Sequence, residues 1–590
     1  MRMPPTTPRG GRALALATLL VALALLNAAL TFHNVWPTPA VEWRGEWSVE
    51  VALLVLGLAS WCAWRGPVRP GVLTALGALA LLFTLARYAE VTAPALYGRG
   101  INLYWDARHV GGAIAMLVRV APAWQLAGAA LAVLAALAAA LLLLRACIAR
   151  LARALEPTPG DAFTAVLRGA LVGVAALAVL LFTIDRRSGS LPAALSRFST
   201  PVSETWAEQL SMLAGSWRAA HAAPSAAAQG DGGSVMPALH RAGGAARDDV
   251  FLVFVESYGA VAWQRPDVAT RLAESRAALA RAIEGSGRGV VSAWVRSPTF
   301  GSGSWLAHAS LLAGAEVRDG DDYARLLLRP RNLLTDVFRR DGYRVLALMP
   351  GLKQAWPEGE YFRFDAIYGE ASLDYRGPAF GWWRIPDQFA LARFDELESQ
   401  ATPAGARSPR FVFFTTISSH VPFRPTPPYQ PDWTRMTAAA PYDAGEAERS
   451  LAQAPEWTRL APAYGDSLAY AQRTLAGWLA RHAGEPLTML VLGDHQPPAA
   501  VSGEGAIHDV PVHVISDRPE VLAALVAQGF VPGLDPAAPT LGPMHALGPR
   551  LVEALGAAPR SPPAPPPSMQ AARAPRAAQG LAVAPVTLPN

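Results

Sequence analysis

The sequence has 590 residues, of which 52% are hydrophobic and only 16% are charged, and its formal net charge is +5. This length predicts at least two folded units. Arg supplies nearly all of the positive charge, and no basic stripe with interleaved aromatic residues is present, which excludes nucleic-acid binding. The two cysteines, Cys62 and Cys147, lie within or beside apolar segments, so a disulfide scaffold and a Cys-based zinc site are excluded after residue 185.

Residues 1–185 carry the apolar excess and predict a transmembrane domain. The first apolar stretch has no clean small-x-small cleavage site after its core, so we interpret it as an uncleaved span and not as a signal peptide. Five stretches in all are long and apolar enough to cross about 30 Å of hydrocarbon, at residues 13–32, 48–64, 71–88, 122–145 and 164–184.

The placement of arginines predicts the orientation of these spans. Arginines precede the first span, occupy the loop between the second and third, and flank the loop between the fourth and fifth. If the N-terminus is cytoplasmic, all of these arginines lie on the cytoplasmic side of the membrane, which agrees with the positive-inside rule. We therefore expect a multi-pass protein of the inner (cytoplasmic) membrane with everything after residue 185 in the periplasm. The arginines in question are Arg2, Arg9, Arg12, Arg65, Arg69, Arg145, Arg150, Arg153 and Arg168.

The segment 97–120 joins the third and fourth predicted spans. It contains Tyr97, Tyr104 and Trp105, followed by an amphipathic run up to Val120. Aromatic residues and arginines at this position suit an interfacial helix in the headgroup plane. A plain connecting loop fits equally well. An interfacial helix would help to present a lipid to the rest of the chain.

The remaining sequence divides into a linker, a folded domain and a tail. Residues 186–246 are rich in Ala, Gly and Ser and predict a linker with one short helix at 201–219. Residues 247–555 predict the extracytoplasmic catalytic domain. Residues 556–590 are dominated by Pro and Ala and predict a disordered tail.

Within 247–555, short apolar runs alternate with helical patterns, which predicts an α/β domain. The predicted strands are 250–255, 289–295, 343–349, 411–417, 487–492 and 510–515. The predicted helices are 266–285, 304–314, 330–341, 386–399, 458–484 and 518–528. This alternation indicates a mostly parallel central sheet with helices on both faces. Ligands of such sheets bind beyond the carboxyl ends of the strands.

Polar residues with metal-binding chemistry follow two of these strands. Glu256 comes directly after the first strand, and Asp494 and His495 follow the strand at 487–492. A carboxylate and an imidazole at one sheet edge supply the oxygen and nitrogen ligands of a divalent ion. Gly493 lets the backbone turn so that both side chains converge. Each motif alone is short, and a surface turn or a helix cap is the alternative for each.

Ser304 is the candidate nucleophile. The second strand leads into a Gly/Ser turn that opens the helix at 304–314, and the start of a helix favours an anionic phosphate. A metal ion that lowers the pKa of the hydroxyl would activate Ser304. The alternative is that Ser304 only caps the helix.

A Glu after the first strand, a Ser at a helix start and a later Gly-Asp-His resemble the alkaline-phosphatase/sulfatase superfamily. Ser304 precedes the Gly of the Leu-Leu-x-Gly helix end, Gly314, with the spacing of a sulfatase nucleophile. The formylglycine signature is absent, since Leu306 and His308 stand where it has Pro and Arg. The resemblance therefore implies an unmodified Ser nucleophile.

Five helices before such a domain resemble lipoteichoic acid synthases and related phosphoglycerol transferases, and also the phosphoethanolamine transferases of lipid A. This resemblance implies one Mn²⁺ or Zn²⁺ ion bound by Glu256, Ser304, Asp494 and His495. The nucleophile of that family is usually Thr, so nearby Thr299, and Ser302 in the same turn, stay open as alternatives.

Three further residues match secondary positions of the family. His420, in a Ser-Ser-His-Val-Pro segment, and His508, before the last strand, would donate to a phosphate oxygen or protonate a leaving group. Trp356 is placed like an aromatic residue that contacts a glycerol headgroup. Glu358 stands where the family has an Arg, so the headgroup remains open.

The resemblance implies a transferase that moves phosphoglycerol or phosphoethanolamine from a phospholipid donor to a glycan or lipid acceptor of the cell envelope. A phosphoserine intermediate on Ser304 would link the two steps. Two alternatives remain: a hydrolase of phosphate or sulfate esters, and a catalytically inactive lipid-binding regulator on the same scaffold.

Overall fold

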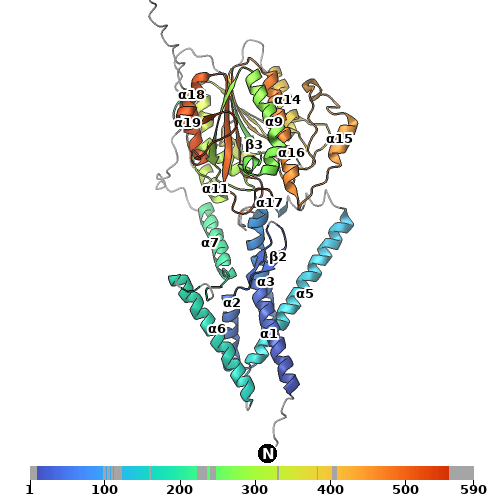
Figure 1. Cartoon of the computed structure of the whole chain (residues 1–590), viewed down its shortest axis with the longest axis vertical. Helices are drawn as coiled ribbons and strands as arrows, with labels where there is room; N and C mark the ends of the chain where they lie inside the picture. Colours follow the sequence, from blue (N-terminus) through green and yellow to red (C-terminus); the bar gives the residue numbers. More distant parts are fainter. Residues whose placement is uncertain are drawn as a thin grey trace, which may run out of the picture.

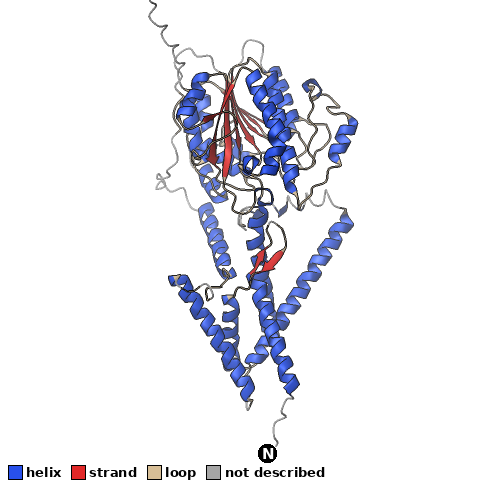
Figure 2. Ribbon diagram, viewed as in Figure 1, coloured by secondary structure: helices blue, strands red, loops and turns tan. Residues whose placement is uncertain are grey.

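The computed structural model describes residues 9–36, 38–97, 101, 106–107, 110–111, 114, 122–158, 161–189, 191–192, 195–221, 236–239, 248–328, 331–381, 383–401 and 408–556. Over these residues the chain forms a bundle of long helices and an α/β domain, which lies at one end of the bundle (Figure 1). Figure 2 shows that the strands gather in the α/β domain, apart from one short hairpin beside the bundle.

Five described helices make up the bundle: α1 (Arg9–Thr31), α2 (Val49–Arg65), α3 (Pro70–Tyr97), α5 (Ala123–Leu155) and α6 (Ala162–Ser188). Four of them, all except α2, are long and apolar enough to cross a membrane. The second predicted span, 48–64, forms α2, whose 17 residues reach about 26 Å at the rise of an α-helix. It lies at the short end of the range for membrane spans.

Contacts along the bundle show that α1 and α3 run in the same direction and α5 in the opposite one. Toward one end, Arg150 in the last turns of α5 donates to Thr18 in the first half of α1 (3.0 Å), and Arg145 donates to Thr74 at the start of α3 (3.1 Å). At the other end, Arg87 of α3 donates to the backbone oxygen of Phe32, just after α1 (2.9 Å). The start of α1 and the α/β domain therefore lie at opposite ends of the bundle.

The predicted ends of two spans are wrong. The third predicted span stops at 88, but α3 continues to Tyr97, and the fourth stops at 145, but α5 continues to Leu155. Both extensions are held by packing: Ala95 is fully buried on α3, and Leu151 is fully buried on α5. Three arginines predicted around the fourth loop consequently lie on α5 itself, and two of them, Arg145 and Arg150, reach neighbouring helices.

At the end nearer the α/β domain the bundle carries a short hairpin and a linker helix. The hairpin pairs β1 (Phe32–Asn34) with β2 (Val41–Trp43). The helix predicted at 201–219 is α7 (Val202–His221), whose first residue is fully buried in the bundle core. Most of the predicted interfacial segment 97–120, part of the predicted linker and the tail from 557 lie outside the described residues.

The α/β domain is built on a mixed sheet in which β3 (Asp249–Val255) is central. Within the described residues its strand order is β10-β4-β9-β8-β3-β7-β5-β6. The pairs β8–β3, β3–β7, β7–β5 and β5–β6 are parallel, whereas β9 is antiparallel to both β8 and β4. The other strands are β4 (Gly289–Arg296), β5 (Arg344–Leu348), β6 (Ala366–Tyr368), β7 (Arg410–Thr415), β8 (Leu487–Gly493), β9 (Asp509–Ser516) and β10 (Val531–Pro532).

Helices cover both faces of this sheet, and alternate strand residues pack on opposite faces. Phe251 and Val253 of β3 pack against one group of helices, whereas Leu252 and Phe254 pack against the other. The first group comprises α9 (Pro266–Gly285), α14 (Asp387–Ala401) and α16 (Leu460–Arg481). The second comprises α10 (Ser304–Ala313), α12 (Leu334–Arg340), α18 (Pro519–Ala527) and α19 (Leu547–Leu555). The predicted α/β architecture with a mostly parallel sheet is confirmed.

The remaining elements are short and lie in the connections between strands and helices. They are α8 (Val261–Gln264), α11 (Gly320–Leu327), α13 (Glu370–Leu373), α15 (Ala444–Leu451) and α17 (Ala499–Ser502), with 3₁₀ turns at Pro357–Glu360, Trp433–Arg435 and Met544–Ala546. The helix predicted at 330–341 starts later, at Leu334, because the Asp336 carboxylate accepts the backbone N–H of Leu333 and fixes the start of α12 there (2.9 Å).

The carboxyl edge of the parallel strands faces the bundle. Helix α17, which follows β8, contacts α3, and α11, which follows α10, contacts α7. Figure 1 shows α17 and α11 at the base of the domain, next to the ends of α3 and α7. The 28 residues of α3 reach about 42 Å, which is longer than the roughly 30 Å of a bilayer core.

Candidate metal centre and active site

Three residues form a compact polar cluster at the carboxyl edge. Glu256 follows β3, and Asp494 and His495 follow β8, its neighbour in the sheet. Their ligand atoms lie within 4.8 Å of one another, and all three residues are buried. The Nε2 of His495 is 3.6 Å from Glu256 Oε1 and 3.8 Å from Asp494 Oδ2. Two carboxylates and an imidazole that converge in this way suit a divalent cation.

Ser304 completes this cluster. Its Oγ donates to Glu256 Oε2 (2.9 Å) and lies 3.1 Å from His495 Nε2. The capping residue of α10 is Gly303, in the left-handed region at φ +80°, and Ser304 is the first helical residue. The alternative that Ser304 only caps its helix is therefore wrong, because its hydroxyl faces the cluster and not the helix backbone.

The other candidate nucleophiles are placed differently. The Thr299 hydroxyl donates to the backbone oxygen of Ser302 (2.5 Å), and Thr299 is buried below the turn. This hydrogen bond holds the Gly/Ser turn closed in front of α10. The structure therefore brings Ser304, and not Thr299, to the carboxylates.

Ser257 is a member of the cluster that sequence reasoning missed. Its backbone N–H donates to Asp494 Oδ1 (2.8 Å), and its hydroxyl donates to Glu256 Oε1 (2.9 Å). It adopts φ +59°, a conformation that non-glycine residues seldom take outside constrained sites. The side chain of a Ser next to a Glu gives no sign of this role, since the backbone conformation creates it.

A glycine is needed at position 493 because two loops approach each other closely there, and not because the backbone makes a sharp turn. It is the last residue of β8, and its φ is not positive. A Cβ at this position would collide with the backbone oxygen of Tyr258 and would lie 3.2 Å from Val510 Cβ. The loops after β3 and β8 therefore touch here, which sets the separation between Glu256 and Asp494.

Local hydrogen bonds orient His495 toward the cluster. Its Nδ1 lies 2.7 Å from the backbone oxygen of Gln496, so Nδ1 carries the hydrogen and Nε2 is directed at Glu256 and Ser304. Burial lowers the pKa of His495, but the charges of Asp494 and Glu256 raise it by more, so that the net shift is upward. Burial, and then the charge of Glu256, raise the pKa of Asp494 to about 6. Without a cation, this site is unfavourable for two ionised carboxylates.

His420 lies beside the cluster, in the loop after β7. Its neighbour Ser419 donates to the backbone oxygen of Glu256 (2.7 Å). Asp387, at the start of α14, accepts the backbone N–H groups of Ile417 and Ser418, which fixes the same loop (2.7 and 3.0 Å). Burial raises the pKa of Asp387 to about 6.

The ring of His420 is held in one tautomer. Its Nδ1 lies 2.7 Å from the backbone oxygen of Val421, so Nδ1–H donates and Nε2 is an acceptor. Burial lowers the pKa of His420, and the nearby His495 lowers it further. The neutral ring is thus favoured, and the edge of Trp383 packs against it with ring centroids 5.1 Å apart.

The other two residues predicted at secondary positions, His508 and Trp356, have different surroundings. His508 is exposed and packs on Phe300 of the Gly/Ser turn, with ring centroids 5.3 Å apart. Trp356 instead is partly buried and stacks on Phe362 (5.6 Å) against the core on one face of the sheet. The structure thus places His420 beside the cluster, His508 on the Gly/Ser turn and Trp356 against the core, and their roles stay predictions.

His308 lies one helical turn after Ser304 and faces the sheet. Its ring packs on Phe254 (4.5 Å) and Phe413 (5.5 Å), and burial lowers its pKa to about 4. Within the described residues its Nε2 has no hydrogen-bond partner. The neutral imidazole therefore forms part of the apolar floor below the cluster.

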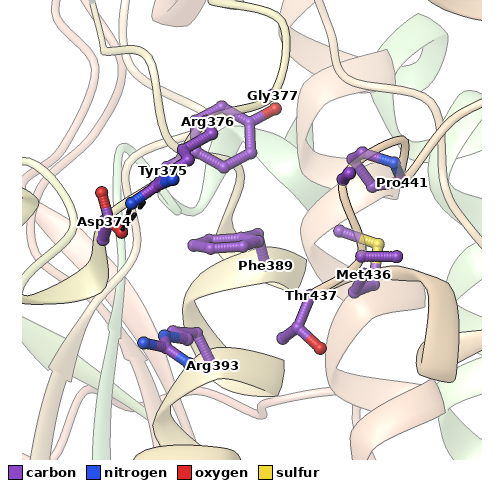
Figure 3. A pocket seen from close by; sticks show the side chains of 11 residues that line it. Asp374, Tyr375, Arg376, Gly377, Phe389, Arg393, Met436, Thr437 and Pro441 are labelled. Carbon is purple, nitrogen blue, oxygen red and sulfur yellow. Dashed lines mark hydrogen bonds and ion pairs between the residues drawn. The ribbon is translucent and has the colours of Figure 1, made fainter.

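A cavity of about 290 Å³ lies away from this cluster, beside α14. Figure 3 shows Phe389 and Arg393 of α14 on one wall and Met436, Thr437 and Pro441 on the other. Its rim holds the ion pair of Arg376 with Asp374 (2.7 Å). None of the predicted site residues lines it.

No family model and no curated protein matches the chain. Among solved structures, it is similar to a protein of the alkaline phosphatase superfamily from Vibrio parahaemolyticus, with 16% identity, a TM-score of 0.32 and coverage of 53% of this chain and 72% of that one. It is also similar to the lipoteichoic acid synthase LtaP of Listeria monocytogenes (13% identity, TM-score 0.34, 55% and 76% coverage). A third similar structure is the Streptococcus pyogenes phosphoglycerol transferase GacH in complex with sn-glycerol-1-phosphate (13% identity, TM-score 0.31, 55% and 83% coverage). These structures belong to the group of proteins that the sequence motifs resemble.

Proposed function

We propose that this chain is a membrane-bound, metal-dependent transferase that moves a headgroup phosphate from a phospholipid to an acceptor of the cell envelope. One observation carries the proposal: the Ser304 hydroxyl points at Glu256 and His495 within a buried cluster suited to a cation. This cluster lies at the sheet edge that faces the membrane helices. A nucleophile in that position is close to donors that cannot leave the bilayer.

Glu256, Asp494, His495 and Ser304 would hold one divalent ion, Mn²⁺ or Zn²⁺. The donor set fits, since it offers carboxylate and hydroxyl oxygens and one imidazole nitrogen whose other nitrogen is hydrogen-bonded. When bound, such an ion lowers the pKa of a coordinated hydroxyl and neutralises charge that develops on the phosphoryl oxygens.

In the first step, Ser304 Oγ forms a bond to phosphorus and gives its proton to Glu256 Oε2, to which it already donates. The bond between phosphorus and the diacylglycerol oxygen breaks, and that oxygen takes a proton from a water molecule on the exposed side, where the His508 ring is accessible. This leaves a hydroxide. Diacylglycerol leaves, and the headgroup phosphate stays on Ser304.

In the second step, an acceptor hydroxyl of a glycan or lipid attacks the phosphoserine. The Nε2 of His420 is an acceptor in a neutral ring, so it can take the proton of this hydroxyl. The new bond joins phosphorus to the acceptor oxygen, the bond to Ser304 Oγ breaks, and Ser304 Oγ takes back the proton that Glu256 Oε2 held after the first step. His420 then gives its proton to the hydroxide that the first step left, which restores the enzyme. Water in place of the acceptor would give the hydrolase.

We infer that the catalytic domain is periplasmic and that the bundle lies in the inner membrane. The arginines near the start of α1 and the ends of α2 and α5 support this orientation through the positive-inside rule. The opposite placement of the start of α1 and the α/β domain supports it as well.

The test uses the full-length chain in detergent–lipid micelles with Mn²⁺ or Zn²⁺ and labelled phosphatidylglycerol or phosphatidylethanolamine. We expect release of diacylglycerol, and a phosphorylated Ser304 detected by mass spectrometry. Ser304→Ala should lower release by at least on the order of a thousandfold, whereas Ser399→Ala, on the exposed side of α14, should not. Thr299→Ala tests the alternative nucleophile.

Three outcomes decide between the alternatives. Full activity of Ser304→Ala would exclude Ser304 as the nucleophile. Release of free headgroup phosphate that added acceptor does not suppress would replace the transferase with the hydrolase. Absence of both bound metal and turnover in the wild-type chain would overturn both enzymes in favour of a lipid-binding regulator.

A further inference from the structure

Lys353 is the one lysine in the sequence, and all other basic charge outside the histidines comes from arginine. It lies in the loop after β5, beyond the same carboxyl edge that carries Glu256 and Asp494. Its Nζ is 5.2 Å from the ring centroid of Trp383, which is within the range of a cation–π contact.

A continuous row of contacts leads from this ammonium group to the candidate metal centre. The ring of Trp383 packs against His420, and His420 is close enough to His495 and Asp494 for their charges to shift its pKa. The residue before His420, Ser419, is hydrogen-bonded to the backbone of Glu256. A headgroup that extends from a phosphate at Ser304 past His420 would therefore run toward Trp383 and Lys353.

The residue after Trp383 is itself held in an ion pair. Arg384 is paired with Glu370 (3.4 Å), so these two charges offset each other. The backbone N–H of Glu370 donates to the carbonyl of Leu352, which holds the Lys353 loop against the same segment (2.9 Å). Gly351 packs against Ile417 of the His420 loop and against Trp383.

The face of a tryptophan is the usual protein surface for an ammonium ligand. Here the ammonium of Lys353 already occupies a position over Trp383. A headgroup with its own ammonium, such as ethanolamine, would be brought next to a like charge, whereas a polyol or an anionic headgroup would not. Like charges placed together are a common means of rejecting the wrong ligand.

We propose that Lys353 selects the donor by excluding cationic headgroups, so that phosphoglycerol is transferred in preference to phosphoethanolamine. This inference rests on the proposed function and deepens it. Lys353 contacts the headgroup and not the phosphorus–oxygen bonds that form and break. It is therefore a specificity residue, and its charge should change the ratio between two donors more than the rate with the better one.

The experiment compares the full-length wild type, Lys353→Met and Lys353→Glu in micelles that contain either phosphatidylglycerol or phosphatidylethanolamine. The readout is kcat/KM for diacylglycerol release with each donor. Arg435→Met is the matched control, because it removes one positive charge from an exposed residue paired with Asp443. Gel filtration and the melting temperature of each variant establish that it is folded.

We expect the wild type to prefer phosphatidylglycerol. Lys353→Met should raise the relative rate with phosphatidylethanolamine by on the order of tenfold, and Lys353→Glu by more. Release from phosphatidylglycerol should change only a few-fold in Lys353→Met, and Arg435→Met should keep the wild-type ratio.

An unchanged donor ratio in folded Lys353→Met and Lys353→Glu would overturn this inference while Ser304-dependent turnover leaves the proposed function intact. An equal loss with both donors would show that Lys353 binds the phosphate and does not discriminate. A wild type that prefers phosphatidylethanolamine also contradicts it. A wild type that turns over neither donor removes the proposed function and this inference together.

Discussion

At the scale of single residues, the geometry of the centre depends on how closely two loops approach each other. Gly493 lies against the backbone of Tyr258, and Ser257 bridges the carboxylates of Glu256 and Asp494 from a left-handed backbone conformation. The separation of the two carboxylates is therefore set by backbone contacts, and small side-chain changes there should have large effects.

Gly493→Ala should destabilise the chain, since the added methyl group has no room against Tyr258 and Val510. Overpacking of a buried site of this kind destabilises by about 1–3 kcal/mol. Thermal unfolding of the full-length chain in detergent measures the change. Gly285→Ala at the end of α9, where a Cβ meets nothing within 4 Å, is the control. Equal melting temperatures for both variants would contradict the close approach.

His513 should make the domain less stable in acid. It is buried on β9 between the Tyr258 hydroxyl (3.1 Å) and Ser292 Oγ (2.7 Å), and burial lowers its pKa to about 3. The unfolded chain takes up this proton below pH about 6.5. The neutral His513 therefore contributes fully to the free energy of unfolding above that pH. This contribution is lost as the pH falls toward 3, by about 1.4 kcal/mol per pH unit.

Urea unfolding of the full-length chain between pH 7 and pH 4 checks this dependence. His513→Gln cannot take up the proton, so its unfolding free energy should fall with pH less steeply than that of the wild type, by one proton. Parallel curves for the two proteins would show that His513 does not remain neutral in the folded state.

The candidate metal ligands are easier to predict from the sequence than the residues that support them. Glu256, Asp494 and His495 directly follow apolar strands, and the pattern of a parallel sheet brings such positions together. Ser257 and Lys353 carry no such pattern. Their roles depend on a positive φ and on the fold of a long loop, which neither periodicity nor spacing specifies.

At the scale of elements, the long strands and helices were predictable because each carries a continuous apolar run or stripe. The strands β6 and β10 were missed, since three and two residues are too short for a pattern. The ends of α3 and α5 were missed for a different reason. Tertiary packing of Ala95 and Leu151 extends these helices past the apolar stretches that predict them.

The contact between α3 and α17 should matter for lipid donors in particular. Ala95→Phe, at a fully buried position near the end of α3, should displace the helix from its neighbours. We expect diacylglycerol release to fall by about fivefold or more, as overpacking of about 1–3 kcal/mol predicts, while cleavage of a water-soluble phosphodiester remains near the wild-type rate.

Ala78→Phe is the control, because Ala78 is exposed on the same helix. It should leave both activities unchanged. A parallel loss of both activities in Ala95→Phe would mean that α3 stabilises the active site itself and does not place it relative to the membrane.

At the scale of the whole molecule, two buried carboxylates and an imidazole without a cation are a source of instability in the α/β domain. A cation that binds only the folded chain should therefore stabilise it. At a concentration one hundred times its dissociation constant, it would add about 2.7 kcal/mol.

After treatment with a chelator, the melting temperature of the full-length chain should accordingly rise on addition of Mn²⁺ or Zn²⁺. Asp494→Asn and Glu256→Gln should lose most of this gain, whereas Glu274→Gln, at an exposed position on α9, should keep it. A gain of equal size in all four proteins would place the bound ion elsewhere.

The single lysine also makes this protein accessible to amine chemistry. Apart from the α-amino group, Lys353 is the one primary amine of the chain, and it is partly exposed beside Trp383. One amine-directed reagent therefore modifies a single side chain next to the proposed donor. The rate of acylation of Lys353, followed by peptide mass spectrometry, becomes a direct footprint of which lipids and acceptors reach that position.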